Sequence, residues 1–385
     1  MTRKLSAATA LLLTLLLASC SGGQPATEPT EPTATANEMM TAAPSPPPIG
    51  RSIDNREERQ ELSAFIANQL TGPYGVYTNF LETGESGEAA TGHEVLSESA
   101  SLLMRAAVLA GDKEQFASQW ALAGRTFDME GGFSYRYSPK QQKQYPVNAA
   151  VDDLRLIGAL YEAGEMFDEP AYTEQADKYS QRFYENNVKE GYMYDFYDRI
   201  YKTTNGFITL CYIDLGTLRK LSISSELRGI LLHNMDGILE EGYLSDTFPF
   251  YETRFDYGTG VYSSDNINTV ESLLSILHLA ETGRQKPASI RYIKEQVEAG
   301  TLYGQYSRDG KPLNEIRSTA IYALAAMIGA EAGDDALYQS GILRMNEFQV
   351  RETTSPLFGG FGNTDTGQAY SFDNLMALLA YSYSL

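Results

Sequence analysis

The feature that most constrains the fold is a repeating pair of helical segments. Apolar runs of helical length end in a small residue followed by Gly, and a more polar run follows each of them. This pattern occurs at Gly111, Gly164, Gly283 and Gly333. Gly just past the last helical turn is a common C-cap, because it adopts a left-handed backbone conformation at no steric cost. The spacing predicts units of about 50–60 residues, one of which lacks its Gly.

The two segments of each pair differ in polarity. The first is apolar nearly all round, which is typical of a helix inside a protein, while the second carries charge on one side and belongs outside. Five pairs can be followed, and an opening helix near 55–70 can pair with the last helix to make six. Six inner helices ringed by six outer ones form an all-α (α/α)6 barrel. An open α-solenoid of the same pairs is the alternative, but short, variable linkers and dissimilar repeats favour the barrel. The inner helices are expected at 96–109, 154–163, 209–218, 270–280, 320–328 and 375–383.

The N-terminus has the pattern of an exported lipoprotein. Arg3 and Lys4 precede an apolar run that is shorter than the roughly 20 residues of a membrane span. A basic start, a short apolar run and small residues before a cleavage point are typical of a signal peptide. Leu17-Ala18-Ser19-Cys20 matches the bacterial lipobox. We therefore expect a signal peptide at 1–19 and a lipid on Cys20, which would anchor the chain to the extracellular face of the cell membrane. An ordinary signal peptide with an incidental Cys20 is the alternative.

The segment after the lipobox differs in composition from the rest of the chain. Residues 20–50 are rich in Pro and Thr and nearly free of large apolar side chains. Such a segment buries too little surface to offset its ordering entropy, so it is predicted to be a flexible tether. Residues 51–385 are enough for one large catalytic domain.

Charge and composition exclude several classes of function. The formal net charge is −20, and loss of Arg3 and Lys4 with the signal peptide makes it −22. No cluster of Lys and Arg survives, which argues against nucleic-acid binding. Only Cys211 follows Cys20, and the three His residues have no spacing typical of a metal site. We expect a monomer without disulfide, metal or cofactor.

Aromatic residues gather just before the predicted inner helices. The chain has 26 Tyr and 16 Phe but one Trp. Segments such as 131–137, 192–204 and 248–265 would all emerge at the same end of the barrel and line its mouth with Tyr, Phe, Asp and Glu. Sugar faces stack on aromatic rings while carboxylates bond to hydroxyls. The mouth is therefore expected to bind a neutral polysaccharide.

Several carboxylates stand at the starts of inner helices. Glycoside hydrolysis needs two carboxyl groups, one protonated and one ionised. Glu98 runs into an apolar helix, where burial would raise its pKa as a general acid requires. The alternative is a first-turn Glu that complements the helix dipole. Asp152 and Asp153, Asp265 and Asp373 are further candidates, each of which could instead be an N-cap.

Two motifs carry a resemblance to a known family. Ser97-Glu98-Ser99, followed by an apolar helix and then Gly111-Asp112 and Phe116, resembles the Ser-Glu-Gly-Gln-Gly-Tyr signature of family 8 glycoside hydrolases. The stretch 150–156 resembles their Asp-x-Asp-Leu-Asp motif. The likeness covers most of 72–385. It is strongest to a divergent branch of Gram-positive lipoproteins that is linked to exopolysaccharide operons and degrades that polymer.

The resemblance implies roles for individual residues. Glu98 matches the general acid, and Asp153 matches the second Asp of the motif, which holds the distorted sugar; the first falls on Val151. Tyr135 falls where the family has an aromatic that stacks on a sugar. Tyr212 and Asp152 are further candidates for substrate binding.

The region of the predicted general base departs most from the family motif. Asp265 falls where the family's Tyr-Asp-Ala-x-Arg motif supplies the base, but Ser264 and Asn266 flank it and Asn268 replaces the Arg. Asp256 is the next candidate for base or substrate binding. The resemblance implies an inverting endo-glycosidase acting on an extracellular or cell-surface polysaccharide, in particular an exopolysaccharide. A polysaccharide lyase and a non-catalytic glycan-binding lipoprotein are the alternatives.

Overall fold

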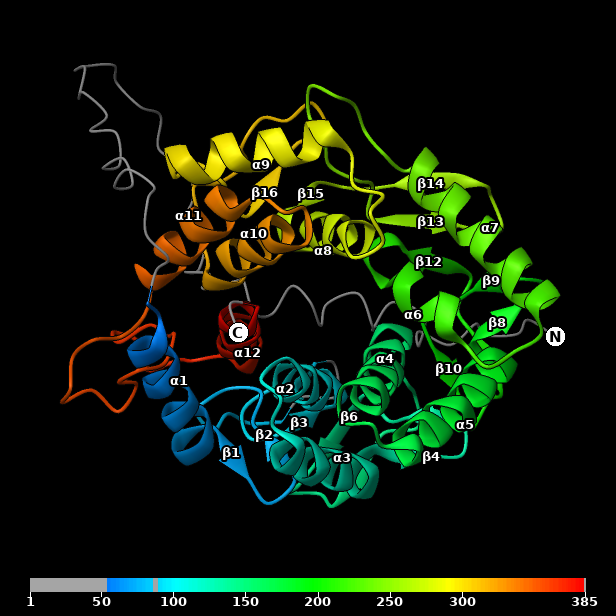
Figure 1. Ribbon diagram of the computed structural model, residues 1–385, viewed down its shortest axis with the longest axis horizontal. Coiled ribbons are helices and arrows are strands. Elements are labelled where there is room, and N and C mark those ends of the chain that lie inside the picture. The colour runs from blue at the N-terminus through cyan, green and yellow to red at the C-terminus, as the bar shows by residue number, and fades with distance from the viewer. Residues whose placement is uncertain (1–53, 86–88, 384–385) are drawn as a thin grey trace, which may run out of the picture.

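The computed structural model describes residues 54–85 and 89–383, and their twelve α-helices form two concentric rings (Figure 1). The predicted signal peptide, Cys20 and the tether at 20–50 lie outside the described residues. The inner ring is α2 (Ser97–Leu109), α4 (Ala150–Met166), α6 (Leu215–Lys220), α8 (Thr269–Ala280), α10 (Thr319–Glu331) and α12 (Ser371–Ser382). The outer ring is α1 (Arg56–Gln69), α3 (Lys113–Phe127), α5 (Pro170–Asn187), α7 (Ser225–Glu241), α9 (Pro287–Ala299) and α11 (Asp335–Asn346).

Burial separates the two rings as the polarity of the sequence predicts. In α8 every residue is buried, and in α10 every residue from Thr319 to Gly329 is buried. The outer α1 buries only Leu62, Phe65 and Ile66, which lie on one face. A helix that is apolar all round needs neighbours on every side, and only an inner position supplies them. The (α/α)6 barrel is confirmed.

The barrel closes where the first and last helices meet. Helix α1 packs against α12. The Gln349 side chain donates a hydrogen bond to the Glu58 carbonyl at 3.0 Å, and Arg351 forms ion pairs with the carboxylates of Glu58 and Glu61. These contacts join residues almost 300 positions apart in the chain. An open solenoid would leave both faces uncovered.

Short antiparallel strands occupy the loops that lead from outer to inner helices. Because each loop precedes an inner helix, the strands gather at the end of the barrel where the inner helices begin. Eight of them form two-residue hairpins, and two three-stranded sheets consist of β12, β13 and β14 and of β3, β6 and β7. The strands are β1 (Thr71–Gly72), β2 (Gly75–Val76), β3 (Val95–Leu96), β4 (Asp128–Met129), β5 (Gly132–Phe133), β6 (Arg136–Ser138), β7 (Lys143–Gln144), β8 (Val188–Lys189), β9 (Tyr192–Met193), β10 (Tyr197–Asp198), β11 (Thr203–Thr204), β12 (Phe207–Thr209), β13 (Arg254–Asp256), β14 (Val261–Ser263), β15 (Ile267–Asn268) and β16 (Gln305–Tyr306).

Gly164 does not end its helix as predicted. Helix α4 continues to Met166, and the left-handed residue after it is Asp168, with φ of 50°. A Cβ on Gly164 would approach the Thr173 hydroxyl to 2.3 Å. This Gly is therefore needed for the close packing of α5 on α4. Gly111, Gly283 and Gly333 do follow their helices with positive φ.

The inner helix predicted at 209–218 is broken. A 3-10 turn at Leu210–Tyr212 is followed by the six-residue α6. The Asp214 carboxylate accepts hydrogen bonds from the Thr217 N–H at 3.0 Å and hydroxyl at 2.6 Å, which caps α6. Asp in the interior of a helical run competes for backbone donors in this way and starts a new helix.

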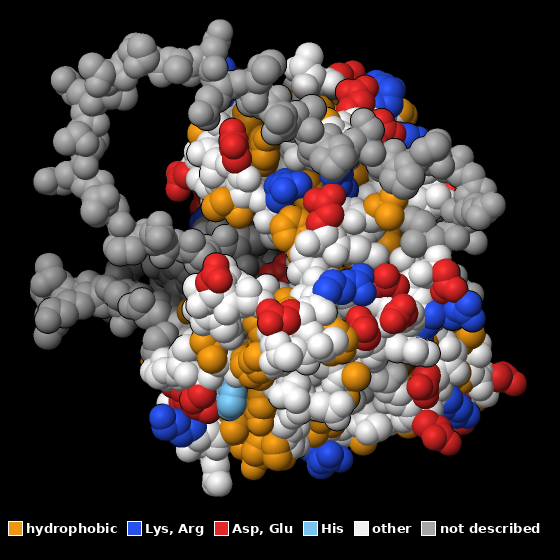
Figure 2. Space-filling model, turned by 90° about the vertical axis from the view of Figure 1, so that its left-hand side faces the viewer, with side chains coloured by type: hydrophobic (Ala, Val, Ile, Leu, Met, Phe, Trp, Pro, Cys, Tyr) orange, Lys and Arg blue, Asp and Glu red, His pale blue; other side chains and the backbone are white. Residues whose placement is uncertain are grey.

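On the face shown in Figure 2, Lys and Arg side chains are interspersed with Asp and Glu, and no continuous basic area is visible there. None of the helices in the described ranges is both long enough and apolar enough to cross a membrane.

A close contact between the helices α10 and α11 gives a stability prediction. A Cβ on Gly341 would lie 2.8 Å from the Ala326 backbone nitrogen, and the α10 backbone cannot move aside. We expect Gly341→Ala to destabilise the fold by about 1–3 kcal/mol in urea unfolding. Gly237 in α7 has no atom within 4 Å of the same position. Gly237→Ala should stabilise by about 0.5–1 kcal/mol. Equal effects at the two sites would contradict this packing.

Candidate active site

Glu98 lies in the first turn of α2, at the end of the barrel where the short strands gather. Strand β3 pairs with β6 and leads directly into the helix. The Glu98 side chain is 16% exposed. Burial raises the pKa of its carboxyl to about 7, the negative charge of Asp152 adds to the rise, and Arg155 opposes it. A carboxyl group that holds its proton near neutral pH is suited to general acid catalysis.

Two residues of α4 complete a cluster with Glu98. The Ser97 hydroxyl donates to Asp152 Oδ2 at 2.8 Å, and the backbone N–H of Glu98 also donates to Asp152. The Arg155 Nη1 atom lies 3.5 Å from Asp152 Oδ1 and 3.8 Å from Glu98 Oε2. We call Glu98, Asp152 and Arg155 the acid cluster. Burial also raises the pKa of Asp152.

The structure does not bring Asp153 to Glu98. Asp153 is 1% exposed, and its carboxylate accepts hydrogen bonds from Asn148 Nδ2 at 2.8 Å and the Phe133 N–H at 3.2 Å. Asn148 in turn bonds to Asn187 of α5, so this side of α4 faces the outer ring. Neighbouring helix positions point about 100° apart. Only one of the two Asp residues can face the barrel axis, and that residue is Asp152.

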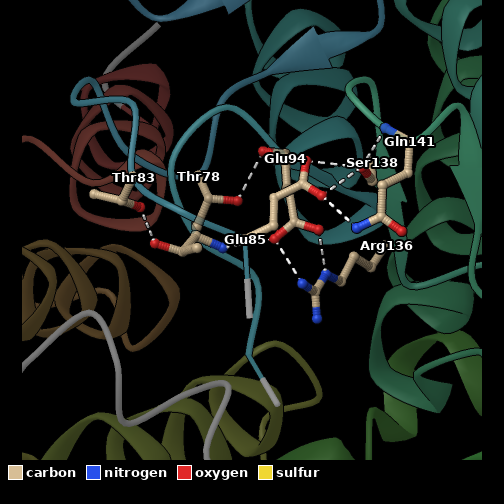
Figure 3. A network of polar contacts seen from close by, with 8 residues as sticks. Thr78, Thr83, Glu85, Glu94, Arg136, Ser138 and Gln141 are labelled. Atoms are coloured by element: carbon tan, nitrogen blue, oxygen red, sulfur yellow. Dashed lines mark hydrogen bonds and ion pairs between the residues drawn. The ribbon is translucent and has the colours of Figure 1, made fainter. Parts of the chain in front are cut away.

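Glu94 is committed to a structural ion pair. Its carboxylate accepts from Arg136 Nε at 2.7 Å and Nη2 at 2.6 Å, and both side chains are fully buried. Figure 3 shows this pair beside Glu85, which accepts from the Ser138 hydroxyl and the Gln141 amide. The network joins the loop before β3 to β6. It therefore supports the strand that positions Glu98.

A second buried acidic group was not singled out from the sequence. Asp195, after β9, accepts from the Thr209 N–H and hydroxyl, both at 2.6 Å. Burial raises the pKa of Asp195 to about 7, and it does the same for Glu271 in the first turn of α8. The positive charge of Arg254 opposes this rise in both groups. The position of Asp195 in the aromatic segment 192–204 was the available signal.

Tyr212 is close enough to both acidic groups for their charges to act on its phenol. Burial raises the pKa of its phenol well above the ordinary value, and the charges of Asp195, Asp152 and Glu98 raise it further. The predicted stacking residue Tyr135 is 6% exposed and packs edge-on against Tyr145, with ring centroids 6.0 Å apart. Both side chains are therefore largely covered by protein, since Tyr212 is 7% exposed, and the charges of the acid cluster act on the Tyr212 phenol.

The two candidate bases differ in their surroundings. Asp265 lies between β14 and β15, is exposed, and makes no hydrogen bond or ion pair with the described residues. Asp256 accepts from the Thr259 N–H at 2.8 Å and hydroxyl at 2.9 Å, and these bonds lower its pKa. Asp256 therefore holds the turn between β13 and β14, and its carboxylate is a weak base.

The side chains of Asp373 and Cys211 are held inside the protein. Asp373 accepts from the Ala320 N–H at 3.0 Å, and burial raises its pKa to about 6. Cys211 is buried, and burial raises the pKa of its thiol. Within the described ranges, no three His, Cys, Asp or Glu side chains are grouped so that they could hold a metal ion.

The chain is similar to proteins of known structure along most of its length. It is 30% identical to a structure described as a novel alpha-amylase from Clostridium perfringens, with a TM-score of 0.79, covering 85% of this chain and 97% of that one. PssZ from Listeria monocytogenes is 19% identical with a TM-score of 0.63, covering 89% and 97%. The endoglucanase Cel10, a family 8 glycosyl hydrolase from Klebsiella pneumoniae, is 14% identical with a TM-score of 0.57, covering 84% and 99%.

One curated protein adds a sequence relative. A protein of Bacillus subtilis (strain 168), YdaJ, which is named as a candidate lipoprotein, is 26% identical over 293 residues, or 74% of this chain and 78% of that protein. No protein-family model matches the chain. The barrel, the motif around Glu98 and the relative at 30% identity agree with the resemblance found in the sequence. The chain belongs to the same family as the Clostridium perfringens structure and shares the (α/α)6-barrel fold of family 8 glycoside hydrolases.

Proposed function

We propose that this protein is an inverting endo-glycosidase that cleaves an extracellular or cell-surface polysaccharide. The observation that carries the proposal is the Glu98 carboxyl, which is buried where the inner helices begin and has a pKa raised to about 7. The lipid on Cys20 would hold the enzyme beside polymer leaving the cell. The fold and family support hydrolysis; the acid, the base and the polymer are our assignments.

In the proposed reaction, Glu98 gives its proton to the oxygen of the leaving sugar while the glycosidic bond breaks. Asp265 takes a proton from a water molecule, and the water oxygen bonds to the anomeric carbon from the opposite face. An inverting pair needs its carboxyl groups about 6.5–9.5 Å apart to leave room for that water. Exposed Asp265 suits this role better than Asp256, since the Asp256 carboxylate is held by Thr259. Asp152 replaces Asp153 as the proposed sugar ligand on α4, with Tyr212 beside it.

The polymer can be identified with a substrate panel. The relative at 30% identity is described as an alpha-amylase, which favours an α-glucan. The lipoprotein relative favours a polymer made at the cell surface. We expect new reducing ends from the exopolysaccharide of the producing cell, with amylose and β-1,4-glucan as the comparison substrates. An unsaturated, ultraviolet-absorbing product would indicate a lyase. Binding without cleavage of any polymer would indicate a glycan-binding protein.

The pH dependence of hydrolysis should report Glu98. The general acid works only when protonated, so activity should fall as pH rises through a pKa of about 7. We expect the alkaline limb of kcat/KM to have its midpoint near pH 7. A limb near pH 4.5, the ordinary range for Glu, would contradict the assigned burial of the acid.

A further inference from the structure

We propose that Arg155 is a positioning residue that sets how readily Glu98 releases its proton, acting with Asp152 as an opposed pair of charges. This inference rests on the proposed role of Glu98 as the acid. Arg155 stands where the family motif ends in Asp, so the cluster differs from the family pattern in the sign of one charge.

The contacts place Arg155 between the two carboxylates. Its Nη1 atom reaches Asp152 Oδ1 at 3.5 Å and Glu98 Oε2 at 3.8 Å, and its side chain is 11% exposed. At such distances and in partial burial, an opposite charge favours the ionised carboxylate, while a neighbouring carboxylate disfavours it. Arg155 therefore favours release of the Glu98 proton, and Asp152 favours its retention. Asp152 is held in place by the Ser97 hydroxyl.

Arg155 also lines a cavity of about 230 Å³ that is bordered by residues of, or next to, all six inner helices. The carboxylates Glu162 and Glu281 in this cavity pair with Arg105, not with Arg155. His278 also lines the cavity, and burial lowers its pKa, so it adds no charge at neutral pH. The Asp214 carboxylate also lines the cavity and accepts from the Thr217 N–H and hydroxyl. Among the described residues, the ion pairs of Arg155 are thus those with Glu98 and Asp152.

The remaining titratable groups near Glu98 are the same in every variant of the test. Asp195 and Glu271, whose pKa values are raised to about 7, and Asp373, whose pKa is raised to about 6, titrate in the same pH range in each of them. From the segment before α6, Tyr212 keeps its proton because its pKa is raised well above 10. From α12, which packs against α2, Asp373 bonds to the Ala320 N–H. Ahead of α2, Glu94 is paired with Arg136, and on α3 Arg125 is exposed. A shift caused by a change at Arg155 or Asp152 can therefore be assigned to those charges.

The test compares the alkaline limb of kcat/KM in four variants of the full chain. Arg155→Met should move the limb upward by about one pH unit, because Glu98 then holds its proton more tightly. Asp152→Asn should move it downward by a similar amount. Arg155→Lys should keep the limb near that of the wild type. Arg105→Met is the matched control, since it removes a buried cation that contacts Glu281 at 2.6 Å, and should leave the limb in place.

Opposite shifts in Arg155→Met and Asp152→Asn support the proposal. Unchanged limbs, or shifts in the same direction, would overturn it. If Arg155→Met does not fold, Arg155→Gln removes the same charge and gives the direction of the Arg155 shift. The carboxyl ¹³C shift of Glu98, assigned with Glu98→Gln and titrated without substrate, reads the same proton. It separates failure of this inference from failure of the proposed hydrolysis.

Discussion

Glu98→Gln is expected to lower the rate of hydrolysis by about 10²–10⁴-fold, the usual contribution of a general acid. The amide has nearly the same shape but no proton to give to the leaving oxygen. Among the described residues, the contact of the Glu98 carboxyl is the 3.8 Å ion pair with Arg155, so the melting temperature should stay close to that of the wild type. Release of reducing ends under single-turnover conditions measures the effect directly.

Glu162→Gln is the matched control for this loss. Glu162 also lies on an inner helix, and burial raises the pKa of its carboxyl, but it lines the axial cavity beside Arg105. It should retain wild-type turnover. Equal loss in both variants would point to general damage of the barrel, and full activity of Glu98→Gln would move the acid to another carboxyl group.

Glu94→Gln should produce the largest loss of stability, about 3–5 kcal/mol in urea unfolding. The change takes away the carboxylate that offsets a fully buried guanidinium, and the neutral amide cannot replace its charge. Arg136 also lies over the Tyr145 ring at 4.4 Å, so it cannot swing into solvent without breaking further contacts. The joint variant Glu94→Leu with Arg136→Met should cost less than the single change, since no charge remains buried.

Lys113→Met provides the comparison for an exposed pair. Lys113 and Glu169 lie 3.1 Å apart with side chains 51% and 41% exposed. Solvent screens such a pair, so the unfolding midpoint should barely move. A loss as large as that of Glu94→Gln would mean that ion pairs in this protein do not depend on burial in the expected way.

The helices were predictable because each carries its own periodic signal. Apolar runs with polar partners gave the two rings and the closing pair α1 and α12. The two-residue strands were not predicted, since a hairpin of that length has no periodicity to detect. The break before α6 was missed because Asp214 lies inside a run that is otherwise apolar.

The site was less predictable than the fold because it depends on the direction in which each side chain points from its helix. Glu98 could be singled out, as it enters an apolar helix after a recognisable motif. Asp152 and Asp153 are equivalent in sequence, and only the contact of α4 with α5 decides which of them faces the axis. Glu271 follows Asn268 at the third helical position, where its N–H bonds to the Asn268 side chain at 3.2 Å, so it has the pattern of an ordinary helix cap.

The contact between α1 and α12 also bears on how the protein is made. Of the described helices, α1 is synthesised first and α12 last, and the barrel is complete only when these two helices have packed together. Until α12 has been made, the apolar sides of α2 and α10, against which it packs, are not covered by it. Stop codons placed before α12 should therefore yield an aggregating chain rather than a smaller enzyme, and nascent chains should depend on chaperones until α12 has been made.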